Sequence, residues 1–229
     1  MRKSNNQHII YYMQKILFTA VMMATLLTAC SSDDDNNTPT ELIDNPNGKT
    51  LVVYFSKTVP DGVDASTGAT QVFNYNNREL GATQWVAQQI ADRTGADMHR
   101  ITVAAGYYPV TYNELADFAR NEKEAGTHPA LTSTLTNLAD YQNIIIGTPV
   151  WWYTVPMPIY SFLDTYDLSG KKIMVFTTHE GSGLADAISV IRQQEPQANV
   201  NATGFQTRGA SAGSQSNAIN EWLNGLGYN

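Results

Sequence analysis

The sequence predicts a three-layer α/β domain in which a doubly wound, five-stranded parallel sheet has helices on both faces. Short apolar runs alternate along the chain with longer segments in which apolar residues recur at helical spacing. The apolar runs are continuous, as in strands that are buried on both sides. The chain has 229 residues, 42% of them hydrophobic, which is enough for one such domain over residues 49–229, where we find no repeat or linker.

The elements of this domain follow one another from residue 49. Residues 51–56 and 143–147 are the clearest apolar runs, and the second one predicts a central strand. The expected strands are residues 51–56, 96–101, 143–147, 172–178 and a weaker one, 199–207. The expected helices are one that begins near Thr83, residues 111–125, residues 157–166, a segment marked by Leu184, Ala187, Ile188 and Ile191, and residues 218–226.

The first 29 residues are typical of a bacterial lipoprotein signal peptide. The apolar run 16–27 follows Lys15 and is shorter than the roughly 20 residues that a spanning helix needs. It ends in Leu27-Thr28-Ala29-Cys30, which resembles a lipobox, where a cysteine is acylated and becomes the mature N-terminus. We therefore expect Cys30 to anchor the protein to a bacterial membrane, on the periplasmic or cell-surface side. The alternative is a chance cysteine behind an ordinary signal peptide.

Residues 30–48 are polar and acidic and predict a flexible tether. The triplet Asp33-Asp34-Asp35 resembles the export signals of surface lipoproteins and is equally well explained as part of a solvated linker. Removal of residues 1–29 would take away three of the 14 Lys and Arg and none of the 21 Asp and Glu. The net charge would then change from −7 to 11 − 21, or −10.

The composition argues against several kinds of site. A single cysteine excludes an internal disulfide and a thiolate metal cage, and the four histidines are scattered, so we expect no metal site. The chain is acidic and has no long basic stretch, so we expect no nucleic-acid partner. No Walker A pattern occurs, which argues against an NTPase.

In a parallel α/β sheet, ligands bind beyond the carboxyl ends of the strands, so three loops are candidates. The first loop ends in Gly81-Ala82-Thr83, directly before a helix, and begins with Ser56. Hydroxyl groups and the free N–H groups of a helix N-terminus can hold a phosphate without any Lys or Arg. The alternative is that Thr83 is only an N-cap.

The second loop, residues 147–158, contains Trp151-Trp152-Tyr153 framed by prolines. A loop is a poor place to bury three large rings, which favours stacking on a flat heterocycle. The alternative is a lid over the core or a partner-binding surface. The third loop, residues 177–183, supplies small hydroxyls, glycine N–H groups, one imidazole and one carboxylate. His179 and Glu180 are either an acid–base pair or polar contacts at the rim of a ligand.

Taken together, these loops resemble the flavodoxin-like family over residues 49–226. The motifs that carry the resemblance occur in the expected order: Tyr54-Phe55-Ser56, Gly81-Ala82-Thr83, Gly147-Thr148-Pro149 with Trp151-Trp152, Pro156-Met157-Pro158, and Thr178-His179-Glu180-Gly181-Ser182-Gly183. The resemblance implies the strand order 2-1-3-4-5, with FMN bound at the point where the order reverses.

The resemblance also implies which residues contact FMN. Ser56, Ala82 and Thr83 would hold the phosphate. One loop would flank the isoalloxazine ring with Pro149, Val150, Trp151, Trp152 and Thr154, and the other with Thr178, His179, Glu180, Gly181 and Gly183.

The chain departs from ordinary flavodoxins by an insertion, residues 57–80, between Ser56 and Gly81. We expect its end to form a hairpin with residues 71–75 as one arm. Within the insertion, Val63 to Thr70 resembles the pattern at which flavin transferases attach FMN to threonine. We hypothesise that Thr70 is flavinylated; the alternative is a chance match in a loop rich in Gly and Thr.

The function that the resemblance implies is that of a redox protein with FMN as cofactor. It would either carry electrons or reduce a quinone or another small acceptor outside the cytoplasm, with an unknown donor and acceptor. An enzyme needs a second cavity over the ring, which the insertion with Tyr107, Tyr108 and Tyr112 could wall. The alternative is a lipoprotein that uses the same fold to bind another ligand or a protein partner.

Overall fold

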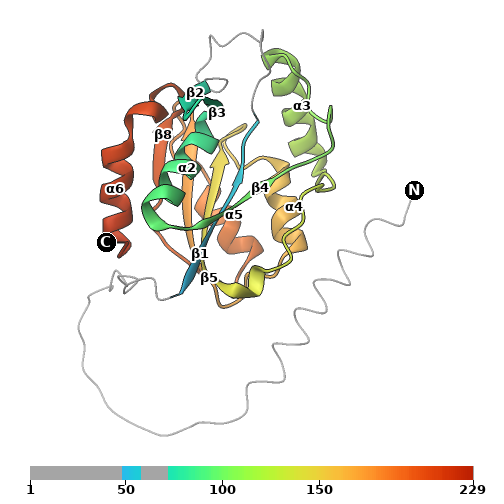
Figure 1. Ribbon diagram of the computed structural model, residues 1–229. Helices are drawn as coiled ribbons and strands as arrows, with labels where there is room; N and C mark the ends of the chain where they lie inside the picture. Colours follow the sequence, from blue (N-terminus) through green and yellow to red (C-terminus); the bar gives the residue numbers. More distant parts are fainter. Residues whose placement is uncertain (1–47, 58–71, 229) are drawn as a thin grey trace, which may run out of the picture. The chain divides into compact units, whose positions relative to one another are not determined.

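The structure is a computed structural model of the chain, and it describes residues 48–57 and 72–228 (Figure 1). The expected signal peptide, Cys30 and the expected tether up to residue 47 lie outside the described residues, as does Thr70 in the insertion. The described part forms one parallel sheet between two layers of helices, so the predicted α/β architecture is confirmed.

The sheet is assembled from the apolar runs of the sequence. Its strands are β1 (Lys49–Phe55), β4 (Asp97–Ile101), β5 (Tyr141–Pro149), β6 (Lys172–His179), β7 (Asn199–Val200) and β8 (Phe205–Arg208). They are all parallel and lie in the order β4-β1-β5-β6-β7, and β8 also pairs with β6. This is the order 2-1-3-4-5 of the predicted strands, which is therefore confirmed. The order reverses between β1 and β5, so a ligand site is expected beyond the carboxyl ends of these two strands.

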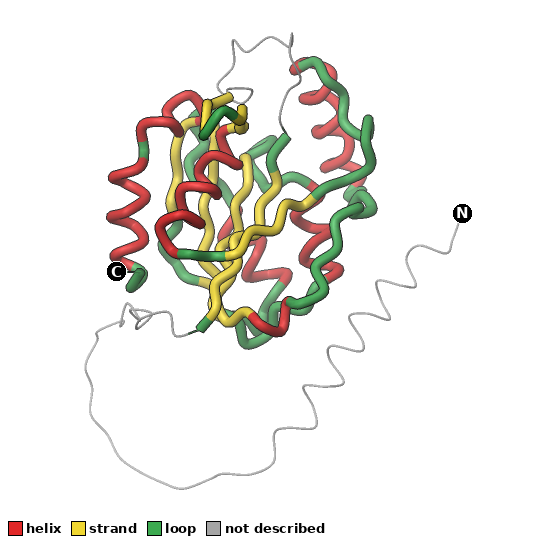
Figure 2. The backbone as a smooth tube through the Cα atoms, in the orientation of Figure 1, coloured by secondary structure: helices red, strands yellow, loops and turns green. Residues whose placement is uncertain are grey.

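Helices cover both faces of the sheet (Figure 2). The helices are α2 (Ala82–Thr94), α3 (Tyr112–Ala125), α4 (Met157–Thr165), α5 (Ala187–Gln194) and α6 (Ser216–Gly225), with short 3-10 helices η2 (Leu138–Asp140) and η3 (Gly209–Ser214). Side chains of α2, η3 and α6 share one hydrophobic core with the sheet, and those of α3, α4 and α5 share the other.

The alternation of side chains along each strand divides the apolar residues between the two cores. In β1, Leu51, Val53 and Phe55 belong to the core beneath α4 and α5, whereas Val52 and Tyr54 belong to the core beneath α2 and α6. All five residues are at most 5% exposed. This double burial explains why the strands are continuous apolar runs.

The end of the insertion is an antiparallel hairpin, as predicted. It consists of β2 (Val72–Tyr75) and β3 (Arg78–Gly81), and Gly81 leads directly into α2. Asn76 and Asn77 form the turn with φ values of 48° and 62°, which asparagine tolerates better than most residues. The hairpin is held against α2 by Phe73, whose ring centroid lies 5.9 Å from that of Trp85.

Two predictions about elements were wrong in detail. The expected strand 199–207 is interrupted, because the chain leaves the sheet after Val200 and returns at Phe205. Between them, the Thr203 N–H donates to the Asn201 side chain at 2.6 Å in a local turn. Helix α5 begins only at Ala187, so Leu184 precedes it in a turn instead of lying within it.

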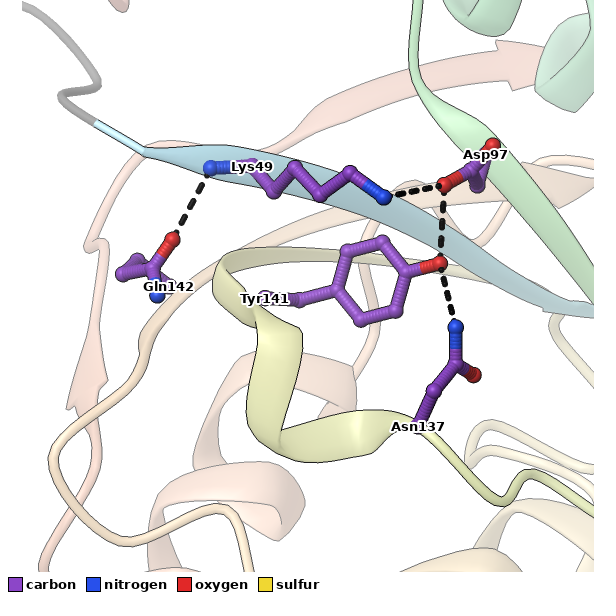
Figure 3. Close-up of polar contacts among 5 residues, drawn as sticks. All are labelled: Lys49, Asp97, Asn137, Tyr141 and Gln142. Atoms are coloured by element: carbon purple, nitrogen blue, oxygen red, sulfur yellow. Dashed lines mark hydrogen bonds and ion pairs between the residues drawn. The ribbon is translucent and has the colours of Figure 1, made fainter.

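A network of polar side chains connects the amino ends of the strands (Figure 3). The Asp97 carboxylate accepts from the Tyr141 hydroxyl at 2.8 Å and from the Lys49 ammonium at 3.3 Å. The Tyr141 oxygen also accepts from the Asn137 amide, and the Lys49 N–H donates to the Gln142 side chain. The hydroxyl of Tyr141, followed by Lys49, lowers the pKa of Asp97.

Candidate functional site

A cavity of about 530 Å³ lies at the other end of the sheet, beyond the carboxyl ends of β1, β5 and β6. It is bordered by the N-terminus of α2, one face of α3 and the loops that follow β5 and β6. The lining residues are Ser56, Lys57, Ala82, Thr83, Tyr112, Leu115, Ala116, Ala119, Pro149, Val150, Trp151, Trp152, Tyr153, Thr178, His179, Glu180, Gly181, Ser182 and Gly209. The loops that the sequence singled out therefore meet at one site.

Hydroxyl groups from three elements line one part of the cavity. Ser56 follows β1, Thr83 lies in the first turn of α2, and Thr178 lies at the end of β6. The hydroxyls of Thr83 and Thr178 are 2.6 Å apart, and both residues are at most 4% exposed. Segments that are 95 residues apart in the chain thus place their hydroxyls in contact.

The first turn of α2 is suited to an anion. Its N-cap is Gly81, which has no side chain to accept from the first N–H groups, and the turn contains no acidic residue. Thr83 is the second helical residue, so the alternative that it is merely an N-cap does not hold. N–H groups without a capping side chain, next to three hydroxyls, are a donor set that fits a phosphate.

Two basic side chains lie at or near this part of the cavity. Lys57 lines the cavity beside Ser56, and the Arg100 guanidinium donates to the Ser56 carbonyl oxygen at 2.9 Å. Burial, followed by repulsion from Arg100, lowers the pKa of Lys57. The sequence could not show this, because it does not reveal into which space a loop side chain points.

The aromatic loop after β5 is a tight turn. The N–H groups of Trp151 and Thr154 each donate to the carbonyl oxygen of the other residue, at 2.9 and 3.1 Å. The two central residues, Trp152 and Tyr153, have φ values of 52° and 63°. Left-handed backbone is unfavourable for bulky side chains, at a cost of about 1 to 3 kcal/mol per residue, and such strain is typical of functional sites.

Helix α3 holds this turn in place at three points. The Trp152 indole N–H donates to the Ala116 carbonyl oxygen at 2.8 Å, and the Lys123 ammonium donates to the Trp152 carbonyl oxygen at 2.7 Å. The Arg120 guanidinium lies 4.2 Å from the centre of the Trp152 ring. Tyr153, by contrast, is 75% exposed at the cavity.

An aromatic layer supports Trp151 from behind. Its ring packs edge-on against Phe55 and Tyr108, with centroids 5.5 and 5.3 Å away. The hydroxyls of Tyr107 and Tyr108 donate to the two oxygens of the Glu122 carboxylate at 2.7 and 2.8 Å. Burial raises the pKa of Glu122, although both hydroxyls favour its ionised form. Burial and this carboxylate raise the pKa of Tyr107 to about 12.

Of the three tyrosines expected to wall a cavity, Tyr112 lines this one, whereas Tyr107 and Tyr108 do not. The side chain of Tyr108 is 5% exposed and belongs to the core. Helical spacing could have identified Tyr112 as the tyrosine that faces the site. Tyr112, Ala116 and Ala119 lie at positions i, i+4 and i+7 of α3 and therefore share one face of this helix.

His179 is held by the protein through both ring nitrogens. The Gly181 N–H donates to Nδ1 at 2.8 Å, so the proton lies on Nε2, which contacts the Gln206 side-chain oxygen. An imidazole bound in this way orients the loop, and both of its ring nitrogens contact groups other than Glu180. The acid–base pairing with Glu180 is therefore disfavoured, and the alternative of contacts at a ligand's rim is retained.

All but two of the residues expected to contact a ligand line the cavity. Thr154 is 3% exposed and pairs with Trp151 across the turn, whereas the Gly183 carbonyl oxygen accepts from the Thr177 hydroxyl at 3.0 Å. The lining residues that were not expected as contacts are Lys57, Tyr112, Leu115, Ala116, Ala119, Tyr153, Ser182 and Gly209. Leu115, Ala116 and Ala119 lie on the face of α3 that turns toward the site.

The segment Gly209–Gly213 matches the GxSxG pattern, which in some hydrolases marks a nucleophilic serine on a strained turn. Here the pattern forms most of η3. Ser211 does not have a positive φ and does not line the cavity. The match therefore gives no support for hydrolase chemistry.

Within residues 48–57 and 72–228, no group of three or more His, Cys, Asp and Glu side chains is arranged to hold a metal ion. The same part of the chain contains no helix of sufficient length and apolarity to cross a bilayer.

Solved structures with the same fold include proteins described as flavoproteins. One from Bacteroides uniformis ATCC 8492 is 27% identical, with 77% of this chain and 98% of that chain covered and a TM-score of 0.57. One from Bacteroides eggerthii DSM 20697 is 24% identical, with 79% and 98% covered and a TM-score of 0.58. A flavoprotein from Lactobacillus acidophilus NCFM in complex with FMN is 20% identical, with 74% and 99% covered and a TM-score of 0.53.

The sequence comparisons agree with the fold. A curated flavodoxin from Nostoc sp. strain PCC 7120 is 31% identical over 90 residues, which are 34% of this chain and 51% of the relative. The chain thus spans about half the length of the curated relatives it matches. A family model described as Flavodoxin matches residues 72–226, which is more than half of the chain. On this match, and with the sheet order and the site at its switch point, the chain belongs to the flavodoxin family.

Proposed function

We propose that this protein is a redox protein that uses FMN to transfer electrons to, or to reduce, a quinone or another small acceptor outside the cytoplasm. The observation that carries the proposal is one cavity in which a phosphate-binding donor set and an aromatic wall meet at the switch point of the sheet. FMN is the cofactor of the flavodoxin family, and when bound it supplies one- and two-electron transfer.

The described residues fit the phosphate of FMN at one end of the cavity. Ser56 and Thr83 offer hydroxyls, and the first turn of α2 offers N–H groups that no N-cap side chain occupies. Each N–H or O–H donor to a phosphate oxygen forms a charge-assisted hydrogen bond, which is stronger than one between neutral groups. These donors would fix the position of the cofactor along the cavity.

The aromatic and backbone groups fit the flavin ring. Trp151, Trp152 and Tyr153 lie on one side, and the loop from Thr178 to Gly181 lies on another. The rings would stack on the flavin and exclude water from it, and the N–H groups of the loop would donate to its polar edge. The hydrogen bonds of His179 to Gly181 and Gln206 would keep that loop in position.

An FMN titration of the purified protein tests the cofactor site. Thr83→Ala removes a hydroxyl and is expected to weaken FMN binding about tenfold, since a hydrogen bond to a charged group contributes about 1.5 kcal/mol. Trp151→Ala removes part of the aromatic wall and is expected to weaken binding at least as much. Thr132→Ala serves as the control, because Thr132 is an exposed threonine that does not line the cavity. Unchanged FMN affinity in both site variants would refute the assignment of these residues to the site, whereas failure of the unmodified chain to bind FMN would favour a non-redox binding protein.

The location outside the cytoplasm is proposed from the lipobox-like sequence before Cys30. Intact mass of the membrane-extracted protein, compared with a Cys30→Ser variant, tests it. A lipid-sized mass difference and loss of the variant from the membrane fraction are the expected results. The same mass spectrum tests whether FMN is attached to Thr70. Attachment would add the mass of the flavin group, and Thr70→Ala would remove this added mass.

A further inference from the structure

We propose that Trp151, Tyr108 and Tyr107 form a redox relay, through which an electron passes from near the protein surface to a strong one-electron oxidant in the cavity. Their rings follow one another outward from the cavity wall, and the Glu122 carboxylate accepts a hydrogen bond from each phenol. The oxidant we name is a flavin excited by blue light, and in this respect the inference rests on the proposed function. The relay itself consists only of side chains of this protein.

The relay begins at the cavity and ends at a half-buried residue. Trp151 lines the cavity, and its ring centroid lies 5.3 Å from that of Tyr108. Tyr108 is 5% exposed, and its ring centroid lies 4.9 Å from that of Tyr107, which is half-buried. The rings of Phe55 and Phe118 pack beside Tyr108. Because indoles and phenols lose an electron far more readily than phenyl rings do, the contacts among Trp151, Tyr108 and Tyr107 define a path for one-electron oxidation.

This arrangement distinguishes Trp151 from the other tryptophans, of which the chain has four in all. Trp85 and Trp222 have phenylalanine rings as neighbours, with centroids 5.9 and 5.8 Å away. Trp152 also lines the cavity, but the Arg120 guanidinium lies 4.2 Å from its ring centre, and a cation in that place opposes the removal of an electron. Among the residues that the structure describes, only the ring of Trp151 combines a place at the cavity with a tyrosine ring behind it.

Glu122 is the acceptor for the phenol protons. The hydroxyls of Tyr107 and Tyr108 donate to different oxygens of its carboxylate, at 2.7 and 2.8 Å, and Glu122 is 5% exposed. Burial and this carboxylate raise the pKa of both phenols, so each phenol keeps its proton in the resting protein. Removal of an electron makes a phenol strongly acidic. A carboxylate that is already within hydrogen-bond distance then takes the proton without movement of either side chain.

Each step of the relay moves one electron. Trp151 gives an electron to the oxidant, which is reduced by one electron, and becomes a radical cation. Tyr108 then gives an electron to Trp151 and its hydroxyl proton to Glu122, which leaves a neutral tyrosyl radical and a protonated carboxyl group. Tyr107 next gives an electron to Tyr108 and its proton to the other oxygen of Glu122, while Tyr108 regains its proton from Glu122. The net result is that one electron passes from Tyr107 to the oxidant and one proton from Tyr107 to Glu122.

The first experiment uses the flavin-free full chain and azide radicals generated by pulse radiolysis, which oxidise tryptophan. The absorbance of the tryptophan radical should decay as that of a tyrosyl radical rises, at a rate independent of protein concentration. Tyr108→Phe keeps the ring and should abolish this transfer, and Glu122→Gln should slow it about tenfold, the value of one hydrogen bond to a charged group. Tyr166→Phe is the matched control, because the ring of Tyr166 packs against Phe162 and should leave the transfer unchanged.

The second experiment tests the path from the cavity. The full chain, saturated with FMN, is illuminated with blue light and frozen, and the tyrosyl radical is measured by electron paramagnetic resonance. The unmodified chain should give this signal, and Trp151→Phe and Tyr108→Phe should lose most of it. Trp85→Phe is the control and should keep it, because Trp85 does not line the cavity. Urea denaturation of each variant shows whether it is folded.

Several outcomes would overturn the relay. One is an equal amount of tyrosyl radical in Tyr108→Phe and in the unmodified chain, and another is a tryptophan radical of the unmodified chain that decays without forming a tyrosyl radical. If the flavin-free chain shows the transfer but binds no FMN, the proposed function fails and the relay stands with a different oxidant. If FMN binds normally and Tyr108→Phe changes neither experiment, only the relay is refuted.

Discussion

The two ends of the central sheet contrast in how their polar groups and backbone are used. At the amino end, Lys49, Asp97 and Tyr141 bond to one another, and neighbouring side chains complete the network (Figure 3). At the carboxyl end, the first turn of α2 lacks a capping side chain, and two bulky residues have left-handed backbone. At one end of the same strands the side chains of Lys49, Asp97 and Tyr141 are thus paired within the protein, whereas the other end has N–H groups and strained backbone of the kind found at ligand sites.

Two turns within the molecule make the same contrast on a smaller scale. Both have two central residues with positive φ, but the hairpin turn uses Asn76 and Asn77, whereas the turn at the cavity uses Trp152 and Tyr153. Asparagine suits this backbone and aromatic residues do not. The contacts of Trp152 with Ala116 and Arg120 of α3 hold the cavity turn in this conformation and compensate for its strain.

The largest expected effect on stability comes from adding a methyl group at Gly147 in β5, against the ring of Phe176. A Cβ atom at Gly147 would lie 2.0 Å from the Phe176 ring, so Gly147→Ala forces that ring out of the core. We expect the free energy of unfolding to fall by about 3 kcal/mol in urea denaturation. Gly225→Ala is the control, because no atom lies within 4 Å of the added Cβ, and its stability should be unchanged or slightly higher. A loss below about 1 kcal/mol for Gly147→Ala would contradict this packing.

The next largest effect on the free energy of unfolding is expected when residue types are exchanged between the two turns. Tyr153→Asn is expected to raise the free energy of unfolding of the flavin-free protein by about 1 kcal/mol, because it relieves left-handed strain. The reverse change at the hairpin, Asn77→Tyr, should lower it by about the same amount. FMN affinity should fall in Tyr153→Asn and stay constant in Asn77→Tyr. If Tyr153→Asn were destabilising, the turn would not be strained in the way we describe.

A pH dependence should arise from Glu122 in the aromatic layer behind Trp151. Burial raises its pKa in the folded state, so folding favours the protonated form. The stability that this group contributes is therefore present below its unfolded pKa of about 4.3 and is lost as the pH rises through the higher folded value. Urea denaturation across this range should show that loss in the unmodified chain and a flatter profile in Glu122→Gln. Identical profiles would show that Glu122 titrates normally.

The smallest effect is expected at the amino end of the sheet. Lys49 and Asp97 are 61% and 57% exposed at their side chains, so solvent and salt screen their attraction. The midpoint of thermal unfolding, Tm, should be the same within error for Lys49→Gln and the unmodified chain. A clear loss of Tm would mean that this exposed network contributes to stability despite screening by solvent and salt.

Continuous apolar runs and helical spacing predict the parallel sheet, its helices and the meeting of the three loops at one edge, because these patterns record which faces are buried. The order of the strands was predicted only by the resemblance to the flavodoxin-like family. The sequence does not reveal the direction of Lys57, since nothing local determines where a side chain after a strand end points. The interruption near Asn201 depends on one side-chain bond to the backbone and leaves the apolar pattern almost unchanged. The sequence also does not predict the left-handed turn at Trp152 and Tyr153, because these residues rarely form such turns and tertiary contacts impose the conformation.

The interruption of the last strand has a consequence for how the protein behaves at high concentration. A parallel sheet of apolar strands presents unpaired N–H and C=O groups at its edges, which can template pairing with another chain. Here one edge consists of a two-residue and a four-residue strand separated by a turn. The opposite edge strand, β4, carries the polar side chains of Asp97, His99 and Arg100. Among the residues that the structure describes, neither edge offers a long, flat, apolar template, which disfavours edge-to-edge aggregation.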